Sequence, residues 1–214
     1  MKSPTYPTGR ALLSGKSVVL TAAAGTGIGY ATAKRCLEEG ARIHISDHHE
    51  ERLSKAAKNL ADLNLGSVSS SICDVTQENQ VQGLIHDATQ TLGEIDVWIN
   101  NAGLGGTAAL RTMSDEAWHR VLDVTLNGTF RCCRAALQQM HGQGHGVIIN
   151  NASVLGWRAQ KGQAHYAAAK AGVMALTRCA ALEAAEFGVR INAVAPSLAM
   201  HPFLAKVTSE ELLS

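Results

Sequence analysis

The chain has 214 residues, 46% of them hydrophobic, and a formal net charge of +1 at pH 7. A chain this close to neutral gives no electrostatic reason to expect nucleic acid or a membrane surface as a partner. Its five cysteines form no C-x-x-C pair, and no segment approaches the ~18 apolar residues of a membrane span. These features predict a cytoplasmic protein with reduced thiols and no metal site.

Short β-rich runs alternate with longer helical patterns after a polar N-terminal arm over residues 1–15. The expected strands are Val18–Thr21, Arg42–Ser46, Ser67–Cys73, Ile95–Asn100, Gly146–Asn151 and Arg190–Val194, with helices at about 28–39, 50–63, 77–92, 114–141 and 164–187. Several strands are apolar throughout, as in a parallel sheet that helices cover on both faces. The alternation predicts one α/β domain over residues 1–214, with a doubly wound parallel sheet in the Rossmann strand order 3-2-1-4-5-6.

A glycine-rich loop joins the first expected strand to the first expected helix. Its sequence is Thr21-Ala22-Ala23-Ala24-Gly25-Thr26-Gly27-Ile28-Gly29. Glycines let the backbone approach a pyrophosphate, whose charge then meets the free amides of a helix N-terminus. The loop therefore predicts a dinucleotide site, with an ordinary tight strand–helix turn as the alternative.

Asp47 ends the second expected strand, about 20 residues after the glycines. Its carboxylate can accept both ribose hydroxyls of an adenosine and would repel a 2′-phosphate. We expect no arginine or lysine beside it, and His48 and His49 are mostly neutral at pH 7. Asp47 thus favours NAD(H) over NADP(H), unless it is only a solvated turn carboxylate.

Two further segments end strands at the same edge of the sheet, where ligands bind in open α/β folds. They are Asp74-Val75 after the third strand and Asn101-Ala102-Gly103 after the fourth. We expect all five residues in the cofactor site. Asp74 could equally cap the helix that begins near Gln77, and the two roles are compatible.

Tyr166 and Lys170 lie four residues apart on an expected helix, and Ser153 ends an apolar run upstream. The spacing puts the phenol and the ammonium on one helix face. Lowering a phenol pKa from about 10 to neutrality requires about 4 kcal/mol. A cation at ~4 Å in an effective dielectric near 20 supplies an energy of that order. With Ser153 holding a substrate oxygen, this set predicts an alcohol–ketone oxidoreductase.

These motifs together resemble the short-chain dehydrogenase/reductase family over essentially the whole chain. The later Arg190-Ile191-Asn192-Ala193-Val194-Ala195-Pro196 fits the same pattern. The resemblance implies that Tyr166 is the general acid/base and that Ser153 positions the carbonyl. It also implies that Lys170 holds the nicotinamide ribose and that Pro196 borders the cofactor, NAD(H) or NADP(H). Since family members form dimers or tetramers, a homo-oligomer is expected.

The sequence departs from the family pattern at several positions. The family's first loop glycine is absent, since Ala22 and Ala23 occupy that stretch, and the loop is one residue longer, with Gly25 inserted. The fourth catalytic member, usually asparagine, aligns with Thr125. In the family this residue acts mainly through its main-chain carbonyl, so we expect Thr125 to preserve the proton relay. The nicotinamide-binding threonine aligns with His201, which could take a direct role.

Family chains normally continue through another helix and a closing strand, whereas this sequence ends at Ser214. We therefore expect six strands, with the C-terminal helix and strand missing and residues 197–214 forming the start of a substrate lid. His165 is expected at the surface or in an interface. Arg158 is expected to be solvated, with a substrate phosphate or carboxylate as the alternative partner.

A closer resemblance, carried by the strings Thr21–Gly29, Asn151–Gln160 and Ser46–Glu50, is to the bacterial steroid-catabolic branch. It implies an alicyclic substrate held as a CoA thioester and derived from sterol rings C and D. The expected function is thus NAD-dependent interconversion of a secondary alcohol and a ketone. A 3-oxoacyl thioester reductase is the alternative enzyme, and a non-catalytic dinucleotide-binding regulator is the alternative from another class.

Overall fold

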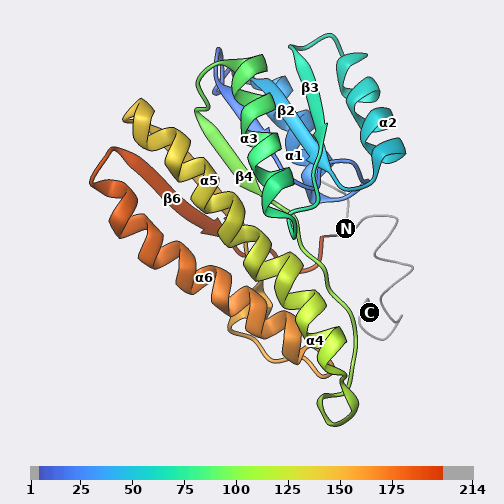
Figure 1. Cartoon of the computed structure of the whole chain (residues 1–214). Helices are drawn as coiled ribbons and strands as arrows, with labels where there is room; N and C mark the ends of the chain where they lie inside the picture. Colours follow the sequence, from blue (N-terminus) through green and yellow to red (C-terminus); the bar gives the residue numbers. More distant parts are fainter. Residues whose placement is uncertain (1–4, 200–214) are drawn as a thin grey trace.

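A parallel six-stranded sheet forms the centre of the protein (Figure 1), and the computed structural model describes residues 5–199. The strands are β1 Ser17–Leu20, β2 Arg42–Asp47, β3 Val68–Ile72, β4 Val97–Asn100, β5 Gly146–Asn151 and β6 Val189–Val194. All five pairings are parallel, and the order is β3-β2-β1-β4-β5-β6. The predicted Rossmann topology is confirmed.

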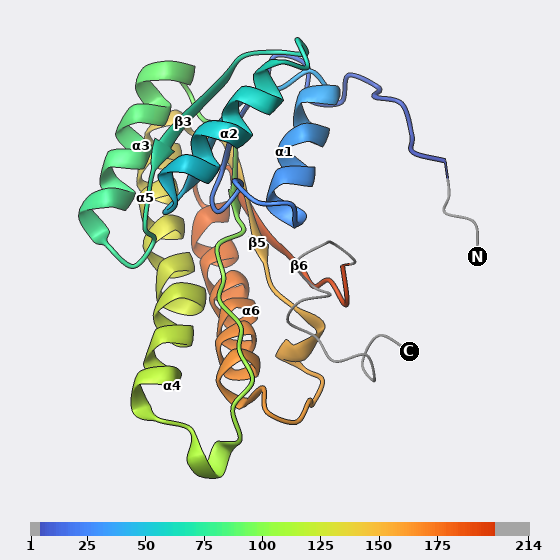
Figure 2. The same ribbon diagram turned by 90° about the vertical axis from the view of Figure 1, so that its right-hand side faces the viewer.

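Helices cover both faces of this sheet (Figure 2). They are α1 Ile28–Glu38, α2 Glu50–Ala61, α3 Glu78–Leu92, α4 Asp115–Leu122, α5 Gly128–Gln143 and α6 Ala164–Ala185. Successive strand residues point to opposite faces. In β1, Val18 and Leu20 accordingly pack against α1 and α2, whereas Val19 packs against α3 and α5. All three are fully buried, which explains why the strand is apolar throughout.

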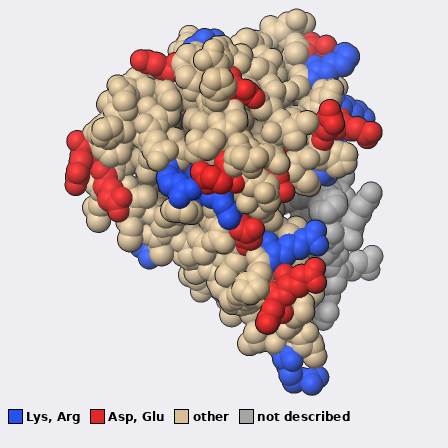
Figure 3. All heavy atoms as spheres, viewed as in Figure 1, with Lys and Arg blue, Asp and Glu red and all other residues tan. Residues whose placement is uncertain are grey.

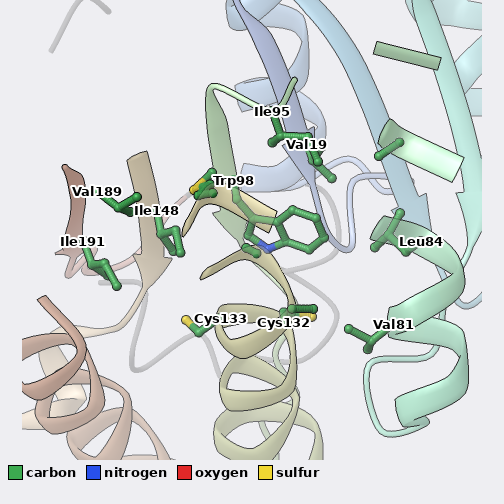
Figure 4. Packing of buried hydrophobic residues seen from close by; sticks show 14 of the residues in the cluster. Val19, Val81, Leu84, Ile95, Trp98, Cys132, Cys133, Ile148, Val189 and Ile191 are labelled. Atoms are coloured by element: carbon green, nitrogen blue, oxygen red, sulfur yellow. The ribbon is translucent and has the colours of Figure 1, made fainter. Parts of the chain in front are cut away.

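Trp98 of β4 fills the space between the sheet and the helices α3 and α5 (Figure 4). Its indole nitrogen donates to Asn100 Oδ1 at 2.7 Å, and Asn100 Nδ2 donates to Asn150 Oδ1 at 2.8 Å. Asn150 Nδ2 in turn donates to the Thr177 hydroxyl of α6 at 2.9 Å. A buried polar network that is satisfied in this way is rigid. It fixes the carboxyl ends of β4 and β5, where the candidate site lies.

The helix predicted over 114–141 is present, but it is not α-helical throughout. Between α4 and α5 the chain makes a π-helical turn over Asp123–Asn127. Such a turn accommodates one extra residue without interrupting the helix, and it is often found at functional sites. Close packing accompanies it, because a Cβ at Gly128 would lie 2.6 Å from Cγ2 of Val75. The other predicted elements differ from the observed ones by a few residues at their ends.

Acidic and basic side chains are interspersed on the face drawn in Figure 3, with no side of one charge. This distribution agrees with the small net charge of +1. Among the described residues, no helix combines the length and the apolar character that a membrane crossing requires.

Candidate active site

The loops that follow β1 and β4 meet at the point where the strand order reverses. The Thr21 hydroxyl accepts hydrogen bonds from the backbone nitrogens of Asn101 at 3.0 Å and Ala102 at 3.1 Å. Beside them lies a cavity of about 430 Å³. Its lining includes Ala22, Asp47, Asp74, Val75, Ala102 and Gly103. The structure thus brings five of the predicted cofactor residues into the wall of one cavity at the topological switch point, with Thr21 and Asn101 beside it.

The glycine-rich loop has the shape of an anion cradle. A Cβ at Gly29 would lie 2.4 Å from the Ala22 carbonyl oxygen and 2.5 Å from Asn101 Nδ2, so only glycine fits there. Since α1 begins at Ile28, the unpaired amides of its first turn border the loop. A Cβ at Gly25 would meet only the Gly27 nitrogen, at 3.8 Å, which is ordinary van der Waals contact. The geometry therefore fits a dinucleotide pyrophosphate, with Gly29 as the glycine that close packing requires.

Ala22, in the stretch where the family's first loop glycine is absent, adopts the left-handed conformation with φ of 52°. A residue with a side chain costs about 1–2 kcal/mol in this region. Asn101 Nδ2 donates to the Ala22 carbonyl at 2.9 Å and helps to hold the turn.

Asp47 is 8% exposed and held by backbone donors at the rim of the cavity. His49 N donates to Oδ1 at 3.0 Å, and Ala24 N donates to Oδ2 at 3.4 Å. One expectation is wrong here, because the Arg52 guanidinium lies 3.9 Å from Oδ1. The first turn of α2 folds back over the end of β2 and brings it there. Arg52 is 54% exposed, so water screens its attraction to the carboxylate.

The Asp74 carboxylate accepts hydrogen bonds from the nearby Thr76 and does not cap α3. Its Oδ1 accepts from the backbone nitrogen of Thr76 at 2.9 Å and from the Thr76 hydroxyl at 2.8 Å. The N-cap of α3 is Gln77. Asp74 and Val75 both remain on the cavity wall.

Ser153, Tyr166 and Lys170 converge at the end of β5. Ser153 begins the 3-10 turn Val154–Gly156, and its hydroxyl accepts from Leu155 N at 3.2 Å. Lys170 Nζ lies 5.6 Å from the centroid of the Tyr166 ring and donates to the Asn151 carbonyl. Desolvation by burial lowers the pKa of Lys170 to about 8.

Burial raises the pKa of Tyr166, and a hydrogen bond with Ser153 acts in the opposite direction. The expected lowering of this pKa by Lys170 is not found in this structure. The reason is geometric, since the ammonium lies over the ring and bonds to the Asn151 carbonyl. In this arrangement Ser153 is the neighbour that favours the ionised phenol.

Asn151 connects the lysine to the loop after β1, and the sequence interpretation missed it. Its Nδ2 donates to Asn101 Oδ1 at 2.9 Å, and Asn101 in turn bonds to the Ala22 carbonyl. The Asn151 main-chain carbonyl accepts from Lys170. A signal was present, because Asn151 ends the strand face on which Val147 and Ile149 are apolar.

Thr125 is fully buried, and its side chain bonds to the main chain of Leu104. The hydroxyl accepts from Leu104 N at 3.0 Å and lies 3.1 Å from the Leu104 carbonyl, to which it donates. Its own carbonyl, expected to serve the relay, already accepts from the Thr129 hydroxyl at 2.8 Å. Thr125 thus anchors the segment after Gly103, a role that the sequence did not indicate.

Thr125→Val should lower kcat/KM about tenfold or more and destabilise the fold by about 1–3 kcal/mol, because Leu104 loses both partners. Thr125→Ser keeps the hydroxyl, so its kcat/KM and its stability should both be close to those of the wild type. Steady-state kinetics and urea unfolding measure the two effects. Ser153→Ala should still cost more activity, and near-wild-type kinetics in Thr125→Val would contradict the anchoring role.

The remaining predicted residues have different outcomes. The Pro196 carbonyl accepts from Val154 N at 3.1 Å, which puts Pro196 beside the turn that follows Ser153. Arg158 is exposed, as expected. His165 is only 2% exposed, so its expected surface position is wrong. It is covered because Gly106 packs against it, with a Cβ position 3.7 Å from Nε2. His201 and the lid residues beyond 199 lie outside the described part of the chain.

Within residues 5–199, no group of three or more His, Cys, Asp or Glu side chains is arranged to hold a metal ion. The groups that the site brings together at this edge are the half-buried phenol of Tyr166, the Ser153 hydroxyl and the Lys170 ammonium, beside the cavity at the carboxyl ends of the strands. This combination defines an oxidoreductase that exchanges a hydride with a nicotinamide cofactor. The chain belongs to the short-chain dehydrogenase family, whose profile, described as short chain dehydrogenase, matches residues 16–212.

Known proteins agree with this assignment. The chain is 60% identical over 212 residues to the (5R,7aS)-5-hydroxy-7a-methyl-1-oxo-2,3,5,6,7,7a-hexahydro-1H-indene-carboxyl-CoA reductase of Mycobacterium tuberculosis, covering 99% of this chain and 81% of that protein. A short chain dehydrogenase from Mycobacterium smegmatis superposes with a TM-score of 0.90 at 58% identity, covering 92% of this chain and 82% of that one. An NAD⁺-bound xylitol dehydrogenase superposes with a TM-score of 0.86 at 34% identity, covering 93% of this chain and 79% of that one.

Proposed function

We propose that this oxidoreductase uses NAD(H) to interconvert a secondary alcohol and a ketone on an alicyclic acid carried as a CoA thioester. The observation that carries the proposal is the convergence of Ser153, Tyr166 and Lys170 beside a cavity rimmed by Asp47. The substrate class is supported by the name of the 60% identical relative, a reductase of an indene-carboxyl-CoA.

In this proposal each residue has a separate task. Tyr166 gives its phenolic proton to the ketone oxygen during reduction and takes it back during oxidation. The Ser153 hydroxyl donates to the same oxygen and keeps it within reach of the phenol. Lys170 holds a ribose hydroxyl, and the hydrogen bond with Ser153 favours the ionised phenol. A bound nicotinamide supplies the hydride for reduction or accepts it in oxidation.

Two other functions remain to be compared with this one. A 3-oxoacyl thioester reductase would use the same Ser153, Tyr166 and Lys170, but most such enzymes prefer NADPH, which Asp47 opposes. A non-catalytic dinucleotide-binding regulator would not need these three side chains. The test is NADH formation from a fused-ring hydroxy acid as its CoA thioester, compared with a linear 3-hydroxyacyl-CoA. Faster turnover of the linear thioester would favour the alternative enzyme, and none with either would favour the regulator.

NAD(H) should bind at least tenfold more tightly than NADP(H), because Asp47 accepts from the ribose diol and repels a 2′-phosphate. Asp47→Ala should narrow this gap by roughly 1–3 kcal/mol, measured as dissociation constants for both cofactors. Arg52→Ala is the matched control, since it removes the nearby cation and keeps the acid. We expect this variant to leave NAD(H) affinity almost unchanged. Equal affinities for the two cofactors in the wild type would reject the preference.

We also propose a homo-oligomer, a dimer or tetramer, paired through α5 and α6. A groove of about 590 Å³ lies between these helices, with Leu137, Leu176 and Phe187 in its wall. Phe130, also in the wall, is 44% exposed, which favours burial against a second copy. Sedimentation velocity would test this. A cytoplasmic location is supported by the five cysteines, all of which are free thiols.

A further inference from the structure

The segment that follows β4 runs beside the beginning of α6 in the opposite direction (Figure 2). Successive residues of this segment contact successively earlier residues of α6 and of the turn that precedes it. A Cβ would lie 3.5 Å from Lys170 Nζ at Gly103, 3.8 Å from Tyr166 Cδ2 at Gly105 and 3.7 Å from His165 Nε2 at Gly106. The Thr107 hydroxyl then accepts from Gln163 Nε2 at 3.3 Å, and Ala108 N donates to the Gly162 carbonyl at 3.0 Å.

This segment is held near both ends. Leu104 is tied to the Thr125 hydroxyl through its nitrogen and its carbonyl, and Ala108 is tied to Gly162. Between these anchors lie two consecutive glycines, Gly105 and Gly106. Neither has a positive φ, so the backbone conformation does not require glycine at either position. The structural effect of glycine at these two positions is therefore the space that a side chain would otherwise occupy.

The space beside Gly105 lies along one edge of the Tyr166 ring. A Cβ at Gly105 would have two heavy-atom neighbours within 4 Å, Cδ2 at 3.8 Å and Cε2 at 3.9 Å of Tyr166. These are ordinary van der Waals distances, so a methyl group would fit without moving the loop. Gly105 is exposed, and the far side of that position is open.

A reacting ketone must bring its oxygen to about 2.6–3.2 Å from the Tyr166 hydroxyl. The two carbons bonded to the carbonyl carbon then approach the ring edges next to that hydroxyl, and Cε2 belongs to one of those edges. A linear ketone needs little width there, whereas a fused ring system needs space on that side. We propose that Gly105 is a specificity-determining residue, whose bare backbone leaves room beside Tyr166 for the rings of an alicyclic substrate. This inference rests on the proposed function.

The test compares Gly105→Ala with Gly106→Ala over a graded series of ketones: a linear ketone, cyclohexanone and a fused bicyclic ketone. The added methyl of Gly105→Ala narrows the space beside Tyr166, and kcat/KM for the bicyclic ketone should fall tenfold or more relative to the linear one. In Gly106→Ala the methyl meets the buried His165 instead, so the ratio should stay within about twofold of wild type. NADH affinity and the unfolding midpoint should be unchanged in both variants.

An equal loss on every ketone, or the same change of ratio in Gly106→Ala, would mean that the loop is merely disturbed and would overturn the inference. An unchanged ratio in Gly105→Ala would overturn it as well. The wild-type rates test the proposed substrate class separately, because a preference for the linear ketone would reject that class. A steeper dependence on ketone size in Gly105→Ala than in the wild type would still support the role of Gly105.

Discussion

Tyr166→Phe is expected to lower kcat by about 10³-fold or more, while NAD(H) affinity stays within about twofold of wild type. Only the proton-exchanging hydroxyl is lost. The ring keeps its place against Lys170, whose ammonium lies 5.6 Å from the ring centroid, and against Gly105. Steady-state turnover and a fluorescence titration with NADH measure the two quantities independently.

Tyr6→Phe is the matched control, because Tyr6 is 61% exposed on the N-terminal arm, where its hydroxyl donates to Glu38 Oε2. It should change neither turnover nor cofactor affinity. Retention of more than a few per cent of wild-type kcat by Tyr166→Phe would overturn the assignment of the acid/base. Loss of NADH binding in the same variant would mean that the phenol also supports the cofactor site.

Lys170→Met is expected to remove turnover, weaken NAD(H) binding and, at the same time, stabilise the fold by roughly 1–3 kcal/mol at pH 7. Lys170 is 3% exposed, and burial lowers its pKa from 10.5 to about 8. Below pH 8 the folded protein keeps a desolvated ammonium, which costs free energy that methionine does not. The loss of the hydrogen bond to the Asn151 carbonyl offsets part of the gain.

The sign of the pH dependence follows from these two pKa values. Between pH 8 and 10.5 the unfolded chain binds more protons than the folded one, so wild-type stability should rise with pH over this interval. The advantage of Lys170→Met should therefore shrink as pH rises and vanish above 10.5. Urea unfolding at pH 7 and at the high end of this interval measures it. Lys161→Met, at an exposed position, should show neither effect. A Lys170→Met protein that is less stable at pH 7 would contradict the desolvation argument.

The features that local sequence determines were predictable. Apolar strands between helical patterns gave the sheet order, because right-handed crossovers leave few alternatives. Gly29 could be assigned to the cofactor loop from its strand–loop–helix setting, and the four-residue spacing of Tyr166 and Lys170 put both on one helix face. The bounds of elements were less certain, since hydrogen bonding at their ends depends on neighbouring loops.

The features that the sequence did not reveal depend on tertiary packing. One extra residue in the turn Asp123–Asn127 leaves the helical periodicity almost intact, so the π turn has no clear signature. Arg52 reaches Asp47 only because α2 folds back over β2. His165 is buried because a distant glycine segment lies over it. In each case the deciding neighbour is brought in by the fold.

The left-handed Ala22 has a consequence for the entropy of cofactor binding. A glycine there would relieve the unfavourable φ of 52° but would give the unbound loop more conformations. With alanine, that ordering takes place during folding, together with the bond from Asn101. The loop amides are then already arranged when a dinucleotide arrives, so less disorder has to be removed at that step. The unfavourable φ of Ala22 thus lowers the folding stability somewhat, and in return the loop is preorganised for the cofactor.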